Sequence, residues 1–395
     1  MSGQRIVRLA NFVSPRSGGL RTALRELGKG YLAAGHEPVL VIPGERASDE
    51  ITEQGRVITL PGPVVPGMGG YRVLLGRRRL IRVLDGLRPA RIEVSDRSTL
   101  RWTGGWAQAR GVPSVMVSHE NLGALVDMFL PRWLPRRMLT DRLNTTTARA
   151  YDHVVCTTAF AAEEFRRLGA SNVERVPLGV DLARFTPDNH DPALRARLAG
   201  QRELLLVHCG RLSTEKRVER SVDALAALRR RGVPAVLAIA GDGPRRAALE
   251  RRAEGLPVRF LGFVRDPDTV ARLLATADAA LAPGPLETFG LAALEALASG
   301  TPVVAAGDGA LGEVVGPAGA VVSGEGFADG VLEVMARPEA DRRRAARDHA
   351  TGFGWPAAVA GMLRVHGLDG PWRSTRRRPP PSLPYSTTLH IHDST

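Results

Sequence analysis

The stretch Ala282–Ser299 reads APGPLETFGLAALEALAS and divides into a short loop and a helical run. It follows an apolar, strand-like segment, and from about Leu291 its alanines and leucines have the composition of a buried helix. A strand, a glycine-containing loop and a helix in this order form one unit of a parallel α/β sheet, in which ligands bind beyond the carboxyl ends of the strands. We therefore predict that this loop lies at the ligand-binding edge of an α/β domain.

The polar groups of this loop suit a phosphorylated sugar. Glu287 and Glu295 lie in apolar, glycine-rich surroundings, where two solvated surface carboxylates would be out of place. The backbone N–H groups of Phe289, Gly290 and Leu291 begin the helix, lack helical partners and can bind phosphate. Glu287 in the loop can accept hydrogen bonds from sugar hydroxyls, and Glu295, just over one turn into the helix, can hold two ribose hydroxyls.

The same alternation of apolar runs and Ala/Leu/Arg-rich helices continues along the chain in two series. Continuous apolar strands flanked by helices indicate parallel sheets that are covered on both faces. The polar segment around Asp181–Arg202 contains Pro187 and Pro192 and separates the series, so we expect two doubly wound domains whose ligand-binding edges face one cleft. The expected strands are Arg5–Ala10, Pro38–Ile42, Arg91–Val94, Pro113–Val117 and Asp152–Cys156, then Leu204–Cys209, Ala235–Ala240, Asp278–Ala282 and Pro302–Ala305.

These segments define the expected domain boundaries. We predict an N-terminal Rossmann-like domain over residues 1–184, a linker over 185–202 and a C-terminal Rossmann-like domain over 203–351. Residues 352–368 are expected to form a helical segment that returns toward the N-terminal domain. Residues 369–395 are rich in Pro, Arg, Ser and Thr, which is typical of a disordered tail.

Composition limits the classes of function. The chain has 395 residues, 44% of them hydrophobic, yet no apolar run approaches the ~18 residues of a spanning helix. Its start lacks a secretory signal, so we expect a cytoplasmic protein. Cys156 and Cys209 each end an apolar run and supply neither a disulfide framework nor a metal site. The net charge of +13 suits anionic partners, but no zinc-finger spacing, RNP-like string or basic stripe with aromatic residues indicates nucleic acid.

Two further loops carry chemistry at predicted strand ends. Gly18 and Gly19 precede a helix expected over Leu20–Ala34 and let a phosphate or a sugar approach backbone N–H groups, although a plain tight turn explains them equally well. Arg211 and Lys216 follow the strand LLLVHC, where a fork-shaped and a point cation suit a diphosphate leaving group. Lys216 is one of only two lysines among 54 Lys and Arg residues, which argues against simple surface solvation.

Together these motifs resemble the retaining GT-B glycosyltransferases of family GT4 over about residues 5–365. The strings NFVSPRSGGLRTAL, EVSDRSTLR, VCTTAFAAEEF and LAPGPLETFGLAALEALASGTP are most similar to actinobacterial GDP-mannose-dependent phosphatidylinositol mannosyltransferases, of the type that elongates the dimannoside. The resemblance implies transfer of mannose from GDP-mannose to a phosphatidylinositol mannoside glycolipid, with the acceptor on the N-terminal domain and the nucleotide sugar on the C-terminal domain. The motifs that carry it are Gly18-Gly19, Gly210-Arg211, Lys216, Gly241-Asp242-Gly243-Pro244, Gly262-Phe263-Val264 and Glu287-x7-Glu295.

The resemblance also implies how the donor is held. Gly18 and Gly19 would line the phosphate side of the cleft, and Arg211 and Lys216 would clamp the diphosphate. Val264 would contact the base through its backbone.

Three further residues match family positions beside the sugar and the ribose. Glu295 would bind the ribose, and Glu287 would bind the transferred sugar. His119, in VMVSHEN after a predicted strand, matches the family's histidine beside the sugar and the acceptor, although a strand-end histidine by itself is more often structural.

The tripeptide Asp266-Pro267-Asp268 spells DxD, which binds metal in a different glycosyltransferase fold. A helix is expected to start near Thr269, so we interpret the aspartates as N-cap and first-turn residues. Because cationic side chains and helix N–H groups already answer the charge of the leaving group, we expect neither a metal nor a cofactor beside the nucleotide-sugar co-substrate.

Two other functions stay open at this point. A UDP-sugar enzyme acting on a soluble thiol, cyclitol or natural product fits equally well in the loop over residues 262–266, which has no side chain that decides between guanine and uracil. A non-catalytic binder of nucleic acid or anionic membrane would leave Glu287, Glu295 and Lys216 unexplained. The sugar, the acceptor and the oligomeric state are not determined by the sequence.

Two basic segments suggest contact with the inner face of the plasma membrane. Tyr71–Leu87 is predicted to be a basic amphipathic helix with Leu80 and Leu84 among its apolar residues, and Met128–Met138 pairs Trp133 with further arginines. Such helices can lie at a membrane interface. The alternative is that the apolar positions pack on the N-terminal sheet and the arginines are merely solvated. The arginines predicted to dock in the first segment are Arg77, Arg78, Arg79 and Arg82.

Overall fold

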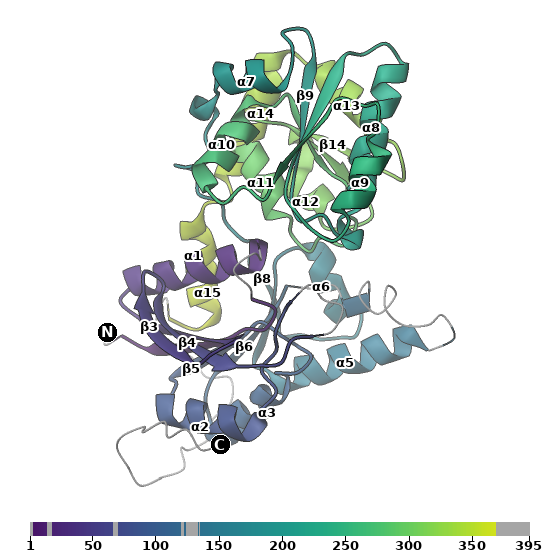
Figure 1. Ribbon diagram of the computed structural model, residues 1–395. Helices are drawn as coiled ribbons and strands as arrows, with labels where there is room; N and C mark the ends of the chain where they lie inside the picture. Colours follow the sequence, from purple (N-terminus) through teal and green to yellow (C-terminus); the bar gives the residue numbers. More distant parts are fainter. Residues whose placement is uncertain are drawn as a thin grey trace.

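The computed structural model describes residues 3–13, 18–65, 70–119, 122–123, 133 and 135–368, which form two α/β domains (Figure 1). The N-terminal sheet has the strand order β3-β4-β2-β1-β5-β6-β7-β8 and is parallel except for β3, which pairs with β4 in the antiparallel sense. Its strands are β1 (Arg5–Leu9), β2 (Glu37–Gly44), β3 (Ser48–Thr52), β4 (Gly55–Pro61), β5 (Arg91–Val94), β6 (Ser114–Ser118), β7 (His153–Cys156) and β8 (Val173–Arg175).

The C-terminal sheet has six parallel strands in the order β11-β10-β9-β12-β13-β14. In both sheets the strand order reverses once, between β1 and β5 and between β9 and β12, and ligands bind outside the carboxyl ends of the strands at such a switch point. The strands are β9 (Leu204–Cys209), β10 (Ala235–Ala240), β11 (Val258–Gly262), β12 (Ala279–Ala282), β13 (Val303–Ala306) and β14 (Ala320–Val322). The expected fold class is therefore confirmed.

Helices cover both faces of each sheet. The N-terminal domain contains α1 (Gly19–Ala33), α2 (Arg77–Leu87), α3 (Trp102–Arg110), α5 (Arg136–Ala150) and α6 (Ala159–Arg166). The C-terminal part contains α7 (Pro192–Leu198), α8 (Glu219–Arg230), α9 (Arg246–Arg252), α10 (Pro267–Thr276), α11 (Leu291–Ala298), α12 (Leu311–Val315), α13 (Phe327–Met335), α14 (Glu339–Thr351) and α15 (Trp355–Val365), with the 3₁₀ turns η1 (Pro187–Asn189), η2 (Thr214–Lys216) and η3 (Gly316–Ala318).

Successive side chains along each strand point to opposite faces of the sheet, so each sheet contributes to two layers of the core. On β9, Leu205 and Val207 pack in the cluster that contains α10, α11 and α14, whereas Leu206 points to the opposite cluster with α8 and α13. On β1, Ile6 faces α1 and Val7 faces the side of α2 and α3. Continuous apolar runs are the pattern that a sheet buried on both faces requires.

The chain crosses between the domains twice, at neighbouring points. The amide of Val180 donates to the carbonyl of Phe353 at 2.8 Å, so the outgoing and returning segments lie side by side. After the second crossing, α15 packs against α1 of the N-terminal domain (Figure 1). The segment that we expected to return toward the N-terminal domain thus contributes a helix to its core.

The segment expected to be a linker is folded onto the C-terminal domain. Asp191 caps α7 by accepting from the amide of Leu194 at 2.9 Å, and Arg195 donates to Asp278 at 2.7 Å. Phe185 and Leu198 are buried in the core. The polar composition that suggested a linker reflects these caps and ion pairs at the surface of a helix.

The structure corrects the helix predicted over Tyr71–Leu87. Helix α2 begins only at Arg77, and in the segment before it Leu74 donates its amide to Asn11 Oδ1 at 2.8 Å. Its apolar side faces the core, where Leu80 and Leu84 are 3% and 0% exposed. The predicted apolar membrane surface of this helix is therefore wrong, and the packing alternative holds.

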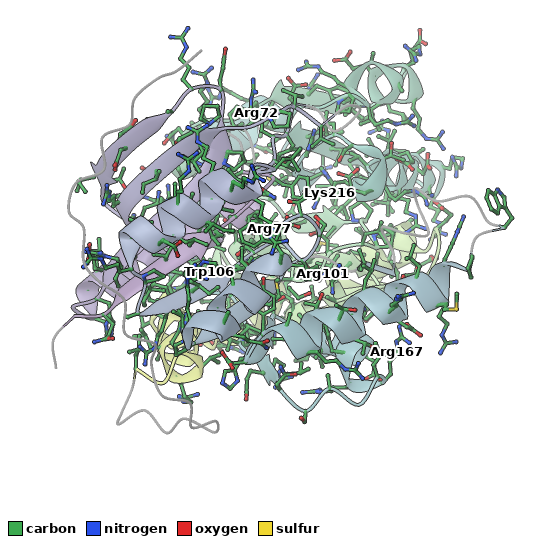
Figure 2. All side chains as sticks on the ribbon, turned by 90° about the horizontal axis from the view of Figure 1, so that it is seen from below. Arg72, Arg77, Arg101, Trp106, Arg167 and Lys216 are labelled. Carbon is green, nitrogen blue, oxygen red and sulfur yellow. The ribbon has the colours of Figure 1, made fainter. Side chains whose placement is uncertain are left out.

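The arginines of α2 lie on its outer side. Arg77, Arg78 and Arg82 are exposed and Arg79 is partly buried. The guanidinium of Arg77 lies 5.0 Å from the ring centroid of Trp102, and Figure 2 shows Arg77 and Trp106 on the helices of this face. In the second basic segment, Trp133 is 81% exposed, whereas residues 128–132 and 134 lie outside the described residues, as does the predicted tail over 369–395.

Candidate active site

The starts of two helices face each other between the domains. Helix α1 follows Gly18 and helix α11 follows Gly290, and neither glycine has a side chain that could cap the free N–H groups. A Cβ built at Gly19 would lie 3.5 Å from Cδ1 of Leu291, so the two helix starts are in near contact. Both carry the positive end of a helix dipole, which favours an anion between them.

The loop before α11 is held in one conformation. Gly290 has a φ of 92°, and a Cβ at this position would lie 2.3 Å from Leu311 Cδ2, so no other residue fits without movement. The ring of Phe289 is buried and meets the ring of Phe353 edge-on, with 6.2 Å between the centroids. The backbone N–H groups predicted to bind phosphate are thus fixed by packing on both sides of the loop.

Lys216 and Glu287 are brought together by this loop. The ammonium of Lys216, at the end of η2, forms an ion pair with the carboxylate of Glu287, and both side chains are partly buried. The loop can approach η2 because a Cβ at Gly284 would lie only 3.3 Å from Lys216 Cα. The cation predicted for the diphosphate and the carboxylate predicted for the sugar are therefore direct neighbours.

Arg211 lies at the carboxyl end of β9 and at the interface between the domains. Its guanidinium carbon is 5.0 Å from the ring centroid of Tyr71, a residue of the N-terminal domain. It is partly buried. This position fits the predicted cation of the diphosphate clamp.

Glu295 lies one turn into α11, and its side chain leans back toward the start of the helix. Burial raises the pKa of Glu295 from its ordinary 4.5 to about 7, although the charge of Arg184 opposes this rise. A carboxyl group with this pKa can either accept or donate a hydrogen bond near neutral pH, which suits a pair of ribose hydroxyls.

The raised pKa of Glu295 has a measurable effect on stability. Because the folded-state pKa lies above the unfolded value, the contribution of this carboxyl group is fully present below about pH 4.5 and is lost as the pH rises through about 7. We expect the Tm of the wild type to fall relative to that of Glu295→Gln between pH 5 and pH 8, without nucleotide. Glu50→Gln on the exposed strand β3 is the control, and a Tm difference that does not change with pH would contradict the raised pKa.

His119 follows β6 and lies on the N-terminal side of the interface. Its Nε2 is 3.2 Å from Ser95 Oγ, at the end of β5, and its carbonyl accepts from the hydroxyl of Thr288 at 2.6 Å. Burial lowers the pKa of His119 to about 4, against the opposing charge of Glu93. The imidazole is therefore neutral near pH 7 and serves as a hydrogen-bonding group.

Two residues that sequence reasoning missed join the domains at this point. The carbonyl of Thr288 accepts from the hydroxyls of Thr157 and Thr158 at 3.1 and 3.0 Å. Glu313, at the start of α12, accepts from the amide of Ala159 at 2.7 Å. Thr288 lies inside the motif that opened the sequence analysis, but its role depends on partners more than 100 residues away, which no local pattern shows.

The remaining predicted site residue, Val264, and the DxD string follow β11, the edge strand of the C-terminal sheet. Val264 follows β11 and packs partly against the core. Asp266 caps α10 by accepting from the amides of Asp268 and Thr269 at 3.2 and 3.0 Å, as predicted, although the helix begins at Pro267. Asp268 pairs with Arg184 at 2.9 Å. Both aspartates of the DxD string thus have structural partners.

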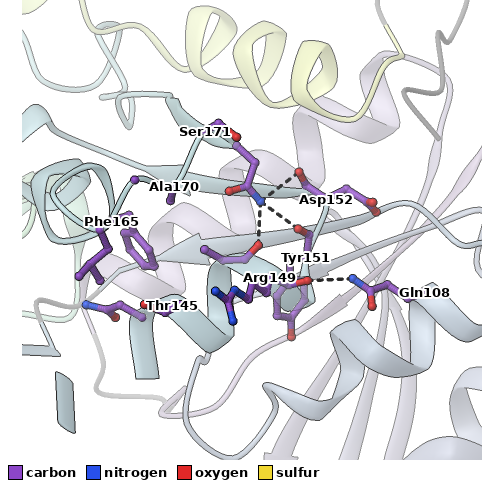
Figure 3. A pocket seen from close by; sticks show the side chains of 13 residues that line it. Gln108, Thr145, Arg149, Tyr151, Asp152, Phe165, Ala170 and Ser171 are labelled. Carbon is purple, nitrogen blue, oxygen red and sulfur yellow. Dashed lines mark hydrogen bonds between the residues drawn. The ribbon is translucent and has the colours of Figure 1, made fainter. Parts of the chain in front are cut away.

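A separate cavity of about 600 Å³ lies at the other end of the N-terminal sheet (Figure 3). It lies between α5 and α6, and Tyr151, Phe165 and Asn172 are among its lining residues. The amide of Asn172 donates to the carbonyls of Ala148 and Tyr151, both at 2.9 Å, so its polar wall is occupied by internal hydrogen bonds. None of the predicted site residues lines this cavity.

Comparisons with known proteins agree with this geometry. Residues 17–184 match the family model "Glycosyltransferase Family 4", and residues 203–337 match "Glycosyl transferases group 1". A GDP-mannose-dependent alpha-(1-6)-phosphatidylinositol dimannoside mannosyltransferase of Mycobacterium tuberculosis is 51% identical over 92% of this chain and 96% of its own. The chain belongs to glycosyltransferase family 4. This membership excludes the hypothesis of a non-catalytic binder and makes the protein an enzyme.

More distant relatives show how widely this family 4 fold is used. A GDP-mannose-dependent alpha-mannosyltransferase of Mycolicibacterium smegmatis is 29% identical over 91% of this chain and 96% of its own. Among solved structures, sucrose-phosphate synthase from Thermosynechococcus elongatus has a TM-score of 0.74, covering 92% and 98% of the two chains at 20% identity. The lipopolysaccharide glycosyltransferase WaaG has a TM-score of 0.66, with 92% and 100% covered at 18% identity. These structures support the GT-B fold of the enzyme.

Proposed function

We propose that the enzyme transfers mannose from GDP-mannose to a phosphatidylinositol dimannoside-type glycolipid, with retention of the anomeric configuration. The observation that carries the proposal is the 51% identity to the dimannoside mannosyltransferase, which extends over both domains. The site supports it, because the helix starts, Lys216 and Arg211 place positive charge where a nucleoside diphosphate would leave.

Departure of the diphosphate is the step that this site would accelerate. As the bond between the anomeric carbon and the phosphate oxygen breaks, negative charge grows on the diphosphate. Lys216, Arg211 and the N–H groups before α11 would stabilise it electrostatically. Glu287, beside Lys216, would hold a hydroxyl of the transferred sugar.

The acceptor proton has a route that does not involve a protein base. A neutral His119 would hydrogen-bond the sugar, since burial keeps its pKa near 4. The acceptor hydroxyl would attack from the face that the diphosphate leaves, form the new bond to the anomeric carbon and pass its proton to the departing phosphate oxygen. Attack from this face retains the configuration without a covalent glycosyl-enzyme.

A donor panel tests the proposal directly. The enzyme is heated with GDP-mannose, UDP-glucose or UDP-N-acetylglucosamine, and the true donor should raise its Tm most. Transfer of radiolabelled mannose to phosphatidylinositol dimannoside, with an α-linked product by NMR, is the expected result. Protection by a UDP-sugar and transfer to a soluble acceptor would contradict this proposal and support the UDP-sugar enzyme considered above.

We expect transfer to continue in excess EDTA. The cationic clamp supplies the charge that a divalent metal would otherwise provide, and both aspartates of the DxD string already have partners in α10 and Arg184. The rate with and without chelator should agree within about twofold. A rate that collapses in EDTA and returns with Mg²⁺ or Mn²⁺ would show that a metal is part of the site.

We also propose that the enzyme docks reversibly on anionic membranes to reach its lipid acceptor. No helix within the described ranges is long and apolar enough to cross a membrane. Since the apolar side of α2 is buried, docking would rely on its exposed arginines and on the exposed ring of Trp133. Each basic residue near an anionic surface contributes about 1 kcal/mol.

Liposome flotation measures this docking. The wild type should float with phosphatidylinositol vesicles at low salt and detach at high salt, because salt screens the attraction. Replacing the four arginines of α2 with glutamine should abolish flotation and leave the Kd for GDP unchanged. The matched control replaces four exposed arginines of the C-terminal domain: Arg202, Arg230, Arg251 and Arg259. Equal flotation of both variants and the wild type would exclude α2 as the docking surface.

A further inference from the structure

One aromatic ring of the N-terminal domain lies under a cation of the donor site. The guanidinium of Arg211 lies 5.0 Å from the ring centroid of Tyr71, within the range at which a cation is attracted to the face of an aromatic ring. Arg211 lies beyond β9 in the C-terminal domain, whereas Tyr71 precedes α2. The contact therefore crosses between the domain that would bind the acceptor and the domain that would bind the donor.

A strained residue contacts the ring of Tyr71. Phe12, just after β1, has a φ of 58°, a conformation that bulky side chains rarely adopt. Its ring meets Tyr71 edge-on, with 6.2 Å between the centroids, and its amide lies 3.4 Å from the carbonyl of Arg72. Strained conformations of this kind persist where the surrounding structure fixes a functional geometry.

The segment around Tyr71 is also fixed by its backbone. The amide of Val65 donates to the carbonyl of Tyr71 at 2.8 Å, and Leu74 donates to Asn11 Oδ1 at 2.8 Å. Asn11 in turn donates to Asp96 at 2.8 Å, at the end of β5. Tyr71 is therefore attached to the switch point of the N-terminal sheet, where the acceptor would bind.

We propose that Tyr71 is a positioning residue for transfer: its ring orients the guanidinium of Arg211 toward the leaving diphosphate when the domains are together. The inference rests on the role proposed for Arg211 in the diphosphate clamp. A guanidinium on a long side chain loses rotamer freedom when it binds, and a ring that fixes its plane beforehand removes part of that loss. The acceptor domain would thereby adjust the cation that the reaction needs.

A double-mutant cycle tests this coupling. Tyr71→Leu keeps apolar bulk without a π face, Tyr71→Phe keeps the ring, and both are made in the wild type and in Arg211→Ala. We expect Tyr71→Leu to lower kcat about tenfold in the wild type with a smaller change in the KM for the donor, because the charge develops in the transition state. Tyr71→Phe should retain wild-type kcat.

The Arg211→Ala background decides between coupling and a structural role. If Tyr71 acts through Arg211, Tyr71→Leu should lower kcat less than about twofold there. A tenfold loss in both backgrounds, or a loss in Tyr71→Phe equal to that in Tyr71→Leu, would overturn the proposal. Equal Tm values for the three single and two double variants confirm that folding is not the cause of any loss.

The same double-mutant cycle is repeated with the Kd as the measured quantity. Calorimetry gives the Kd for GDP and for UDP, since both carry a diphosphate. Non-additive losses in Kd for the diphosphate that binds would support the positioning role even if the wild type does not use GDP-mannose. Failure of the proposed donor and failure of the Tyr71 inference are therefore distinguishable. Additive losses in both kcat and Kd would leave Arg211 in the clamp and exclude Tyr71.

Discussion

Lys216→Ala is expected to lower kcat by about 10²–10³-fold, as the loss of one group that stabilises a developing oxyanion does elsewhere. The ammonium of Lys216 lies beside Glu287 at the loop before α11, where the diphosphate would leave. Its removal would also leave the Glu287 carboxylate without its ion-pair partner next to the departing phosphate, which adds repulsion in the transition state. Steady-state kinetics with saturating GDP-mannose measures the effect.

The chain provides a matched control, since its other lysine lies away from the site. Lys29 on α1 contacts Glu26 and Glu53 at 3.5 and 3.1 Å at the surface. Lys29→Ala should retain the wild-type kcat, because exposed ion pairs contribute little. Lys216→Arg should recover part of the activity by restoring the charge. If Lys216→Ala and Lys29→Ala have equal kcat, the clamp is wrongly placed.

Arg211 and Glu295 should separate turnover from donor binding. Arg211→Ala should also lower kcat, whereas Glu295→Ala should mainly raise the Kd for the donor, because the ribose is remote from the changing charge. The clamp cations and the ribose-binding carboxylate thus have different expected signatures. If Lys216→Ala, Arg211→Ala and Glu295→Ala all lost donor affinity with no change in kcat, this division of roles would be wrong.

The central strands of both sheets could be predicted because burial on both faces leaves a continuous apolar run. Strands β5, β9 and β10 have the predicted bounds, β12 begins one residue later than predicted, and β13 is shifted by one residue at both ends. Strands β3, β4, β8, β11 and β14 were missed. They lie at or next to sheet edges, where half of the side chains face solvent, as in β3 with the sequence SDEIT, and no apolar run marks them.

The candidate site was predictable where its chemistry lies in one local motif. Glu287, Gly290 and Glu295 could be placed because one loop and one helix contain them all. The contacts of Thr288 and Tyr71 could not be predicted, since each depends on a partner in the other domain. The helix predicted from Tyr71 was too long because Leu74 donates its amide to the distant residue Asn11 of the same domain, a contact that no local pattern shows.

A buried charge cluster, which the sequence did not predict, joins the end of α15 to the N-terminal sheet. Glu93 on β5 pairs with Arg8 at 2.9 Å, accepts from the hydroxyl of Tyr31 at 2.7 Å and lies 3.3 Å from His366, which follows α15. Arg8, Glu93 and His366 are each 1% exposed. Burial alone would raise the pKa of Glu93, but the charge of Arg8 and the hydrogen bonds hold it well below its ordinary value.

Glu93→Gln is expected to lower the free energy of unfolding by about 3–5 kcal/mol, because it leaves the guanidinium of Arg8 buried without its counter-charge. The C-terminal domain over residues 203–351 contains no tryptophan, so tryptophan fluorescence in a urea titration reports mainly on the N-terminal domain and α15. Arg8→Met combined with Glu93→Gln should recover most of the loss, since no unpaired charge is left.

Asp49→Asn removes the exposed pair with Arg56 on β3 and β4 and should cost less than about 1 kcal/mol. The stability that Glu93 confers is present above about pH 4.5 and is lost as the pH falls toward its depressed pKa, so the difference between wild type and Glu93→Gln should shrink in acid. Equal losses in Glu93→Gln and Asp49→Asn would show that this cluster does not anchor α15.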